Sequence, residues 1–75
     1  MPRELQPPYL RVSEDMRRKV MEAEWLPGEQ VPSLDQLAAE YQVSRATVQR
    51  AVRLLTDEGL LVTRPRWGTF VAGGQ

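Results

Sequence analysis

The chain contains no cysteine and no histidine. Without cysteine it has no disulfide and no thiolate metal ligand, and without histidine it lacks the commonest general base and metal ligand. The carboxylates do not replace them, because they show no cluster with metal-ligand spacing. We therefore expect no enzymatic activity, no cofactor and no bound metal.

Long hydrophobic runs are also absent. No apolar stretch approaches the roughly 20 residues that cross a bilayer, and the N-terminal MPRELQPP has no hydrophobic signal segment. These absences predict a cytoplasmic protein with no membrane partner. At 75 residues, the chain has room for one small domain with a single core.

The net charge is zero, but the charge is unevenly distributed. Residues 1–42 carry five basic and eight acidic side chains, whereas residues 43–75 carry five basic and two acidic ones. The five basic residues of the second part are all arginines: Arg45, Arg50, Arg53, Arg64 and Arg66. Arginine suits phosphate and guanine because its planar fork donates two parallel hydrogen bonds, although a GC-rich genome also enriches arginine.

Apolar spacing predicts a first helix over roughly 9–24, preceded by a disordered lead over 1–8. Its predicted inner face is Val12, Met16, Val20 and Ala23. Its outer face reads as a solvated surface of exposed charge pairs. Trp25 follows the helix and is expected to pack on the core, and the segment near Val31 is expected to be extended.

Two helix caps follow in close succession. Ser33 and Gln36 form a capping-box pattern that predicts a short helix over about 34–41, and Ser44 predicts a third helix that ends at Gly59. The third helix should bury Val48, Ala51, Val52 and Leu55 and expose Ala46, Gln49, Arg50 and Arg53. Two short helices joined by a tight turn are typical of a helix-turn-helix, whose second helix enters the DNA major groove.

Two β-prone segments, LLVTR and GTFVA, flank PRW and predict a hairpin, or wing. With the extended segment near Val31, this hairpin should form a small antiparallel sheet. The predicted fold is therefore α+β, a winged helix-turn-helix of three helices and a small antiparallel sheet. The domain should span 9–72, with 73–75 as a tail or the start of a linker.

The stretch LPGEQVPSLDQLAAEYQVSRATVQRAVRLLTDEGLLVTRPRWGTFVA resembles the N-terminal DNA-binding domain of GntR-type bacterial transcriptional regulators. The likeness runs from Pro8 to Ala72, and Tyr9 and Trp25 are most similar to the HutC-like branch. The resemblance implies binding of double-stranded operator DNA, usually by a repressor, with a larger C-terminal domain that senses a small molecule and holds a dimer. We expect the isolated chain to be a monomer that becomes dimeric on DNA or in a longer parent protein.

The resemblance and the arginine distribution together give a set of candidate DNA-binding residues: Ser33, Ser44, Arg45, Thr47, Gln49, Arg50, Arg53, Arg66, Trp67 and Gly68. Ser44 and Thr47 also suit a helix cap, Gln49 an ordinary surface position, and Arg53 a backbone contact or a solvated side chain.

The wing residues have alternatives too. Arg66 is expected at the minor groove, where A·T-rich segments concentrate negative potential. Trp67 either contacts DNA or folds back beside Val62 or Phe70, and Gly68 suits a turn.

The sequence departs from the family pattern at several positions. Asp35 stands where the family usually carries an arginine that can reach DNA, and a carboxylate there would repel phosphate. Gln49 replaces a frequent arginine, Arg50 a frequent acid, Ala46 a common threonine, and Arg66 the usual glycine at the wing tip. A different operator preference is the expected result. The alternative function is a winged helix that uses the same surface to bind another protein.

Overall fold

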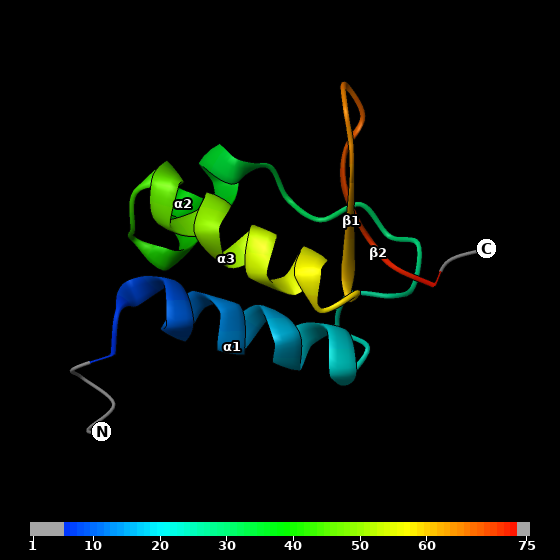
Figure 1. Cartoon of the computed structure of the whole chain (residues 1–75), viewed down its shortest axis with the longest axis horizontal. Helices are drawn as coiled ribbons and strands as arrows, with labels where there is room; N and C mark the ends of the chain where they lie inside the picture. Colours follow the sequence, from blue (N-terminus) through cyan, green and yellow to red (C-terminus); the bar gives the residue numbers. More distant parts are fainter. Residues whose placement is uncertain (1–5, 74–75) are drawn as a thin grey trace.

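The computed structural model of the chain describes residues 6–73, which form three helices followed by a β-hairpin (Figure 1). The helices are α1 (Pro8–Met21), α2 (Leu34–Tyr41) and α3 (Arg45–Asp57), and the strands are β1 (Leu61–Arg64) and β2 (Gly68–Val71). This arrangement confirms the predicted α+β winged helix-turn-helix. Most of the predicted lead and of the predicted tail lies outside the described residues.

Helix α1 ends at Met21, three residues before the predicted end. Ala23 has a φ of 61°, in the left-handed region, so the helix cannot continue through it. The Trp25 N–H then donates to the Lys19 carbonyl at 3.1 Å, which turns the chain back toward the core. The prediction that Ala23 lies on the inner face is wrong, because Ala23 is exposed, whereas the predicted burial of Trp25 is confirmed.

Both predicted caps are present. Ser33 Oγ accepts the Gln36 N–H at 3.1 Å, and Gln36 Oε1 accepts the Ser33 N–H at 2.9 Å, so α2 begins with a complete capping box. Ser44 Oγ accepts the Thr47 N–H at 3.1 Å and caps α3. Gly59, with a φ of 82°, follows the end of α3 as predicted. The Ser44 cap thus closes the short connection between α2 and α3, and the Ser33 box sets the start of α2.

The hairpin pairs Leu61 with Val71 and Arg64 with Gly68 in an antiparallel register. The predicted third strand is a single bridge between Gln30 and Phe70, supported by the Val31 N–H donating to the Thr69 carbonyl at 2.9 Å. Pairing does not extend further, because Ser33 would be the next donor toward β2 and its N–H is bonded to Gln36 Oε1 in the capping box. The sheet is therefore a two-stranded wing tied to the loop before α2.

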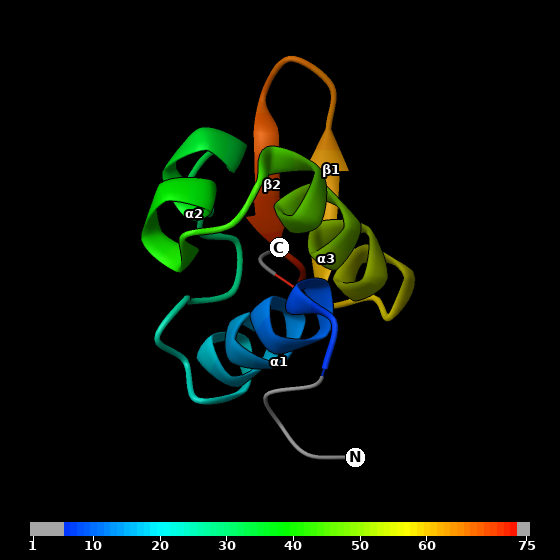
Figure 2. The ribbon, with the colours of Figure 1, turned by 90° about the vertical axis from the view of Figure 1, so that its left-hand side faces the viewer.

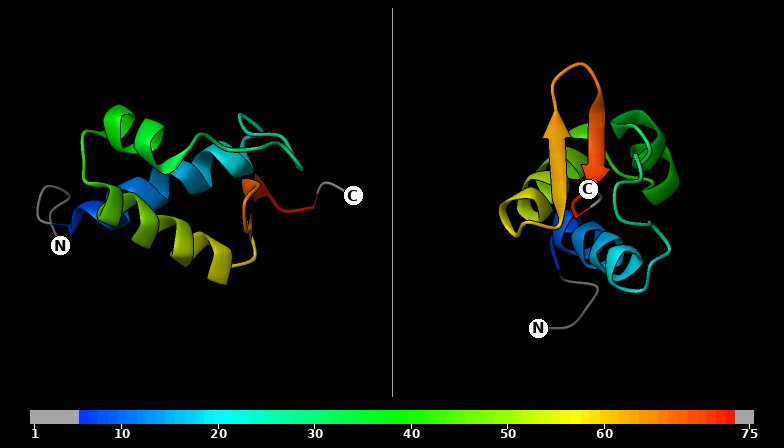
Figure 3. Two further views of the ribbon diagram at one scale, coloured as in Figure 1. Left: turned by 90° about the horizontal axis from the view of Figure 1, so that it is seen from above. Right: turned by 90° about the vertical axis from the view of Figure 1, so that its right-hand side faces the viewer.

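The core lies between α1, α3 and the base of the hairpin. Helix α1 runs along the bottom of the molecule in Figure 1, and Figure 3 places the hairpin at the C-terminal end of α3. The buried apolar residues are Val12, Met16, Trp25, Val31, Leu37, Val48, Ala51, Val52, Leu55, Leu61 and Val71. The inner face predicted for α3 is thus confirmed.

Exposed ion pairs cover the outer face of α1, as predicted. Arg18 contacts Asp15, Glu22 and Glu24 at 2.9 to 3.3 Å. Arg17 makes two hydrogen bonds to Glu58 at the C-terminal cap of α3, at 2.7 and 2.9 Å. Arg17 and Arg18 are therefore paired with acids, whereas within residues 6–73 the two arginines of the wing form no ion pair.

Candidate nucleic-acid interface

The candidate interface begins with the exposed face of α3. Ala46, Gln49, Arg50 and Arg53 are all exposed, on the side of α3 away from its buried residues. The wing tip and α2 project on the side of α3 opposite α1 (Figures 1 and 2). The recognition helix of the predicted helix-turn-helix therefore presents two arginines and a glutamine to solvent beside the wing.

The N-terminal end of α3 combines a cap with hydrogen-bonding capacity. Ser44 Oγ donates to Thr47 Oγ1 at 3.0 Å while it accepts the Thr47 N–H. Thr47 thus completes the cap, and its own hydroxyl hydrogen remains available to an outside acceptor. A helix N-terminus also attracts anions through its free N–H groups and its dipole. Capping and phosphate binding are therefore compatible at Ser44 and Thr47.

Arg45, the first residue of α3, is paired with an acid. Its Nε lies 2.8 Å from Asp35 Oδ1 in an ion pair, and the two side chains are 66% and 75% exposed. Exposed pairs of this kind contribute about 0 to 1 kcal/mol to stability. The sequence did not reveal this contact, and the only available signal was that both residues fall in the first turns of consecutive helices.

Arg50 lies on the edge of the α3 face that is nearest α1. Its guanidinium carbon lies 3.8 Å from the centroid of the Tyr9 ring, a cation–π contact. Tyr9 belongs to the first turn of α1, so this contact reaches across the two helices. The stacking holds the exposed Arg50 charge in a defined place, and nothing in the sequence indicated it.

The tip of the wing is a tight turn. The Trp67 N–H donates to the Arg64 carbonyl at 3.0 Å, Pro65 occupies the second position, and Arg66 has a φ of 70° at the third. This is the pattern of a type II turn, which favours glycine at the third position. Arg66 therefore keeps this turn at the cost of backbone strain.

Trp67 is 73% exposed, so the structure does not favour the alternative in which it packs onto the sheet. It lines a shallow hollow with Val62 and Phe70 without being buried there. The reason is the turn, because the Trp67 carbonyl accepts a hydrogen bond from Gln30 Nε2 at 2.8 Å and its backbone is held at the rim of the hairpin.

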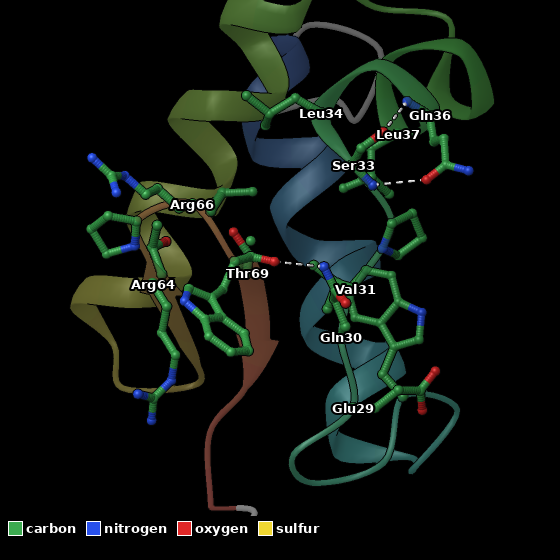
Figure 4. A pocket seen from close by; sticks show the side chains of 17 residues that line it. Glu29, Gln30, Val31, Ser33, Leu34, Gln36, Leu37, Arg64, Arg66 and Thr69 are labelled. Atoms are coloured by element: carbon green, nitrogen blue, oxygen red, sulfur yellow. Dashed lines mark hydrogen bonds between the residues drawn. The ribbon is translucent and has the colours of Figure 1, made fainter.

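A groove separates the wing from α2. Figure 4 shows Arg64 and Arg66 on the wing side and Ser33 with Gln36 on the α2 side. Arg64 and Arg66 are exposed, and no ion pair holds either of them within residues 6–73. The candidate residues Ser33, Arg66, Trp67 and Gly68 therefore line one groove, next to the exposed face of α3.

The described part of the chain brings no three carboxylate, histidine or cysteine side chains together as metal ligands. None of its helices is long and apolar enough to span a membrane.

Comparison with known proteins places this geometry in a family. Residues 8–71 match the profile described as bacterial regulatory proteins, gntR family. The histidine utilization repressor of Klebsiella aerogenes is 44% identical over 66 residues, which are 88% of this chain and 27% of that protein. The repressor of the same name from Pseudomonas aeruginosa is 41% identical over 66 residues, covering 88% and 26%. The chain spans about a quarter of the length of these curated relatives.

Solved structures agree with the sequence relatives. AraR(DBD) in complex with operator ORX1 superposes with a TM-score of 0.89 at 30% identity, over 96% of this chain and 87% of that one. Its complex with operator ORR3 gives a TM-score of 0.87 at 32% identity, over 91% and 82%.

The fold, the arginine-bearing α3 and these relatives define a winged helix-turn-helix domain of the class that binds specific DNA sequences in transcriptional regulators. The chain belongs to the GntR family of bacterial regulatory proteins. The histidine utilization repressors among its relatives confirm the resemblance to the HutC-like branch. Because the family and the relatives are regulators, the prediction that the chain is not an enzyme is also confirmed.

Proposed function

We propose that this domain binds operator DNA for a bacterial transcriptional repressor, with α3 in the major groove and the wing at the adjacent minor groove. The observation that carries the proposal is the exposed face of α3. Apart from Asp57 at the end of the helix, every charged side chain of α3 is an arginine. An α-helix fits the major groove, and arginine and glutamine are the side chains that read guanine and adenine there. The cytoplasm is where such a regulator would act.

The contacts divide by chemistry. Arg45 and Gln49 are the proposed base-reading side chains, because they lie in the first turns of α3, the part of a recognition helix that meets base edges. Arg50 and Arg53 are proposed to contact phosphate, with further donors from the Ser33 and Thr47 hydroxyls and from the free N–H groups at the start of α3, which Ser44 caps. Arg66 is proposed to contact the minor groove or its flanking phosphates.

The position of the wing arginines supports a role for the wing in DNA binding. The exposed Arg64 and Arg66 line the groove beside α2, next to the exposed face of α3 (Figure 4). The solved relatives bound to operator DNA support duplex DNA as the partner, rather than the alternative of a protein partner.

The experiment is a fluorescence-anisotropy titration of duplex DNA at several salt concentrations, followed by selection of bound sequences from a random duplex pool. If Arg50, Arg53, Arg64 and Arg66 each neutralise one phosphate, the logarithm of affinity should fall with the logarithm of salt with a slope of about −3 to −4. Selection should then return a defined half-site. Absence of salt-sensitive association would reject DNA binding and favour a protein partner.

A further inference from the structure

Asp35 and Arg45 form the only ion pair that joins α2 to α3 within residues 6–73. Arg45 Nε and Asp35 Oδ1 are 2.8 Å apart, and both side chains remain mostly exposed. Water screens such a pair, and two flexible side chains must be ordered to form it, so it adds little to folding stability. Its main consequence is for the side chain that the proposed function assigns to base reading.

The geometry of the pair selects one edge of the Arg45 guanidinium. An arginine offers parallel donors either from Nε with a terminal nitrogen or from its two terminal nitrogens. Asp35 Oδ1 lies nearest to Nε, so the two terminal nitrogens form the edge further from the acid, and this edge can make a bidentate contact. O6 and N7 of guanine accept such a fork. Holding the side chain before DNA arrives also reduces the entropy lost on binding.

The Asp35 charge opposes a competing contact. An unpaired arginine is attracted to any phosphate, and phosphate contacts carry no sequence information. Asp35 lies in the first turn of α2, where free N–H groups would otherwise favour an anion. Its carboxylate repels phosphate there and neutralises part of the Arg45 charge. Both effects make base reading by Arg45 more favourable relative to backbone binding.

We propose that Asp35 is a positioning residue that sets the sequence specificity of Arg45, directing the two terminal guanidinium nitrogens to a guanine at the cost of non-specific affinity. This inference rests on the proposed function, and in particular on Arg45 as a base reader. It gives a role to the acid that stands where the family usually carries arginine.

The test measures base preference rather than affinity alone. Duplexes selected by the wild-type chain are substituted at each base pair and titrated with Asp35→Asn, Arg45→Ala and the double variant. Asp35→Asn keeps the size and a hydrogen-bond acceptor but removes the charge. It should reduce preference about two- to tenfold at the base pair that Arg45→Ala affects. Affinity for unrelated duplex DNA should stay the same or rise. In the Arg45→Ala background, Asp35→Asn should leave preference unchanged.

Asp57→Asn is the matched control, because it removes one carboxylate at the other end of α3. It should leave base preference unchanged. Asp35→Ala, which also loses the acceptor, should lose at least as much preference as Asp35→Asn, and thermal unfolding checks that both variants fold. Wild-type preference in Asp35→Asn, or an equal loss with and without Arg45, would overturn the inference alone. A wild-type chain that does not bind duplex DNA would overturn the proposed function with it.

Discussion

Gln30 Nε2 donates a hydrogen bond to the Trp67 carbonyl at 2.8 Å, and it occupies the space where a side chain on residue 68 would begin. A Cβ added to Gly68 would lie 2.6 Å from this nitrogen, and the φ of Gly68 is 118°. A side chain at this position would push the Gln30 amide away from the Trp67 carbonyl, and the positive φ also favours glycine. Gly68 shapes the candidate interface without needing to contact DNA itself.

Gly68→Ala should lower the free energy of unfolding by about 1 to 3 kcal/mol, since it combines backbone strain with a contact that displaces Gln30. Urea unfolding measures the loss. Gly59→Ala is the control, because Gly59 also has a positive φ but has nothing within 4 Å of an added Cβ. Gln30→Ala in the Gly68→Ala background should restore the part of the unfolding free energy that is lost through the contact with Gln30. Equal losses in Gly68→Ala and Gly59→Ala would contradict this explanation.

Arg66→Gly tests the role of the Arg66 charge in DNA binding without disturbing the turn. Glycine adopts the positive φ of position 66 without strain, so stability should stay the same or rise by up to about 1 kcal/mol. Affinity for operators with A·T-rich flanks should fall, and the salt slope should drop by about one unit. Anisotropy on A·T-rich and G·C-rich flanks measures both effects. Unchanged affinity on both operators would remove the wing from the DNA site.

Arg45 and Arg50 should differ in what they contribute. Arg45→Ala should cost about 1 to 3 kcal/mol and relax preference at one base pair, whereas Arg50→Ala should weaken all sequences alike and lower the salt slope by about one unit. Tyr9→Leu removes the ring under Arg50 but keeps the charge, so it should leave the salt slope unchanged. The same uniform loss from Arg45→Ala and Arg50→Ala would show that their proposed roles are wrong.

The sequence predicted the structural features that depend on residues close together in the chain. The capping box of Ser33 and the cap of Ser44 need partners only three residues away, and the buried face of α3 follows from helical periodicity. The helix end at Met21 was missed because the chain reversal depends on a left-handed residue, Ala23, that has no glycine signal. Interactions between residues close in sequence were thus sufficient to predict the fold, with an error at the end of α1.

Contacts between helices could not be predicted in the same way. The Asp35–Arg45 pair and the stacking of Arg50 on Tyr9 join residues brought together by the packing of separate elements. The sequence gives the charges of these side chains but not the angle and distance between the helices that carry them. For the candidate site, the sequence therefore predicted the types of side chain. The partners that orient these side chains could be identified only from the three-dimensional structure.

Acid should destabilise the fold partly through Asp15. Burial raises the pKa of this carboxyl, but the hydrogen bonds from Tyr41 and Arg18, together with the charges of Arg18 and Lys19, outweigh it and leave the pKa below its ordinary value. A lowered pKa adds stability above the unfolded value of about 3.9, and this stability is lost as the pH falls through the folded value. The melting temperature should therefore decline below about pH 4.

Tyr41→Phe removes the hydroxyl that donates to Asp15 Oδ2 at 2.6 Å. The variant should melt lower at neutral pH and lose less on acidification, because the Asp15 pKa returns toward its ordinary value. Glu58→Gln is needed beside it, since the hydrogen bond from Arg17 also lowers the pKa of Glu58 and contributes in the same direction. An acid transition in Tyr41→Phe as steep as in the wild type would exclude this role for the Asp15–Tyr41 bond.

The last prediction concerns assembly. The apolar faces of α1 and α3 are buried against each other. Within residues 6–73, the large apolar side chains left exposed lie in two places: Met21 and Leu26 near the end of α1, and Val62 and Trp67 on the wing. A stable interface buries about 800 Å² on each partner, with an apolar centre. We therefore expect this chain to be monomeric in sedimentation and to bind one half-site weakly.

Fusion to a dimeric coiled coil should tighten binding to a duplex with two half-sites by about 10² to 10⁴, because the second contact becomes intramolecular. A single half-site should gain far less. A tight dimer of the unfused chain, or equal gains on one and two half-sites, would contradict the prediction.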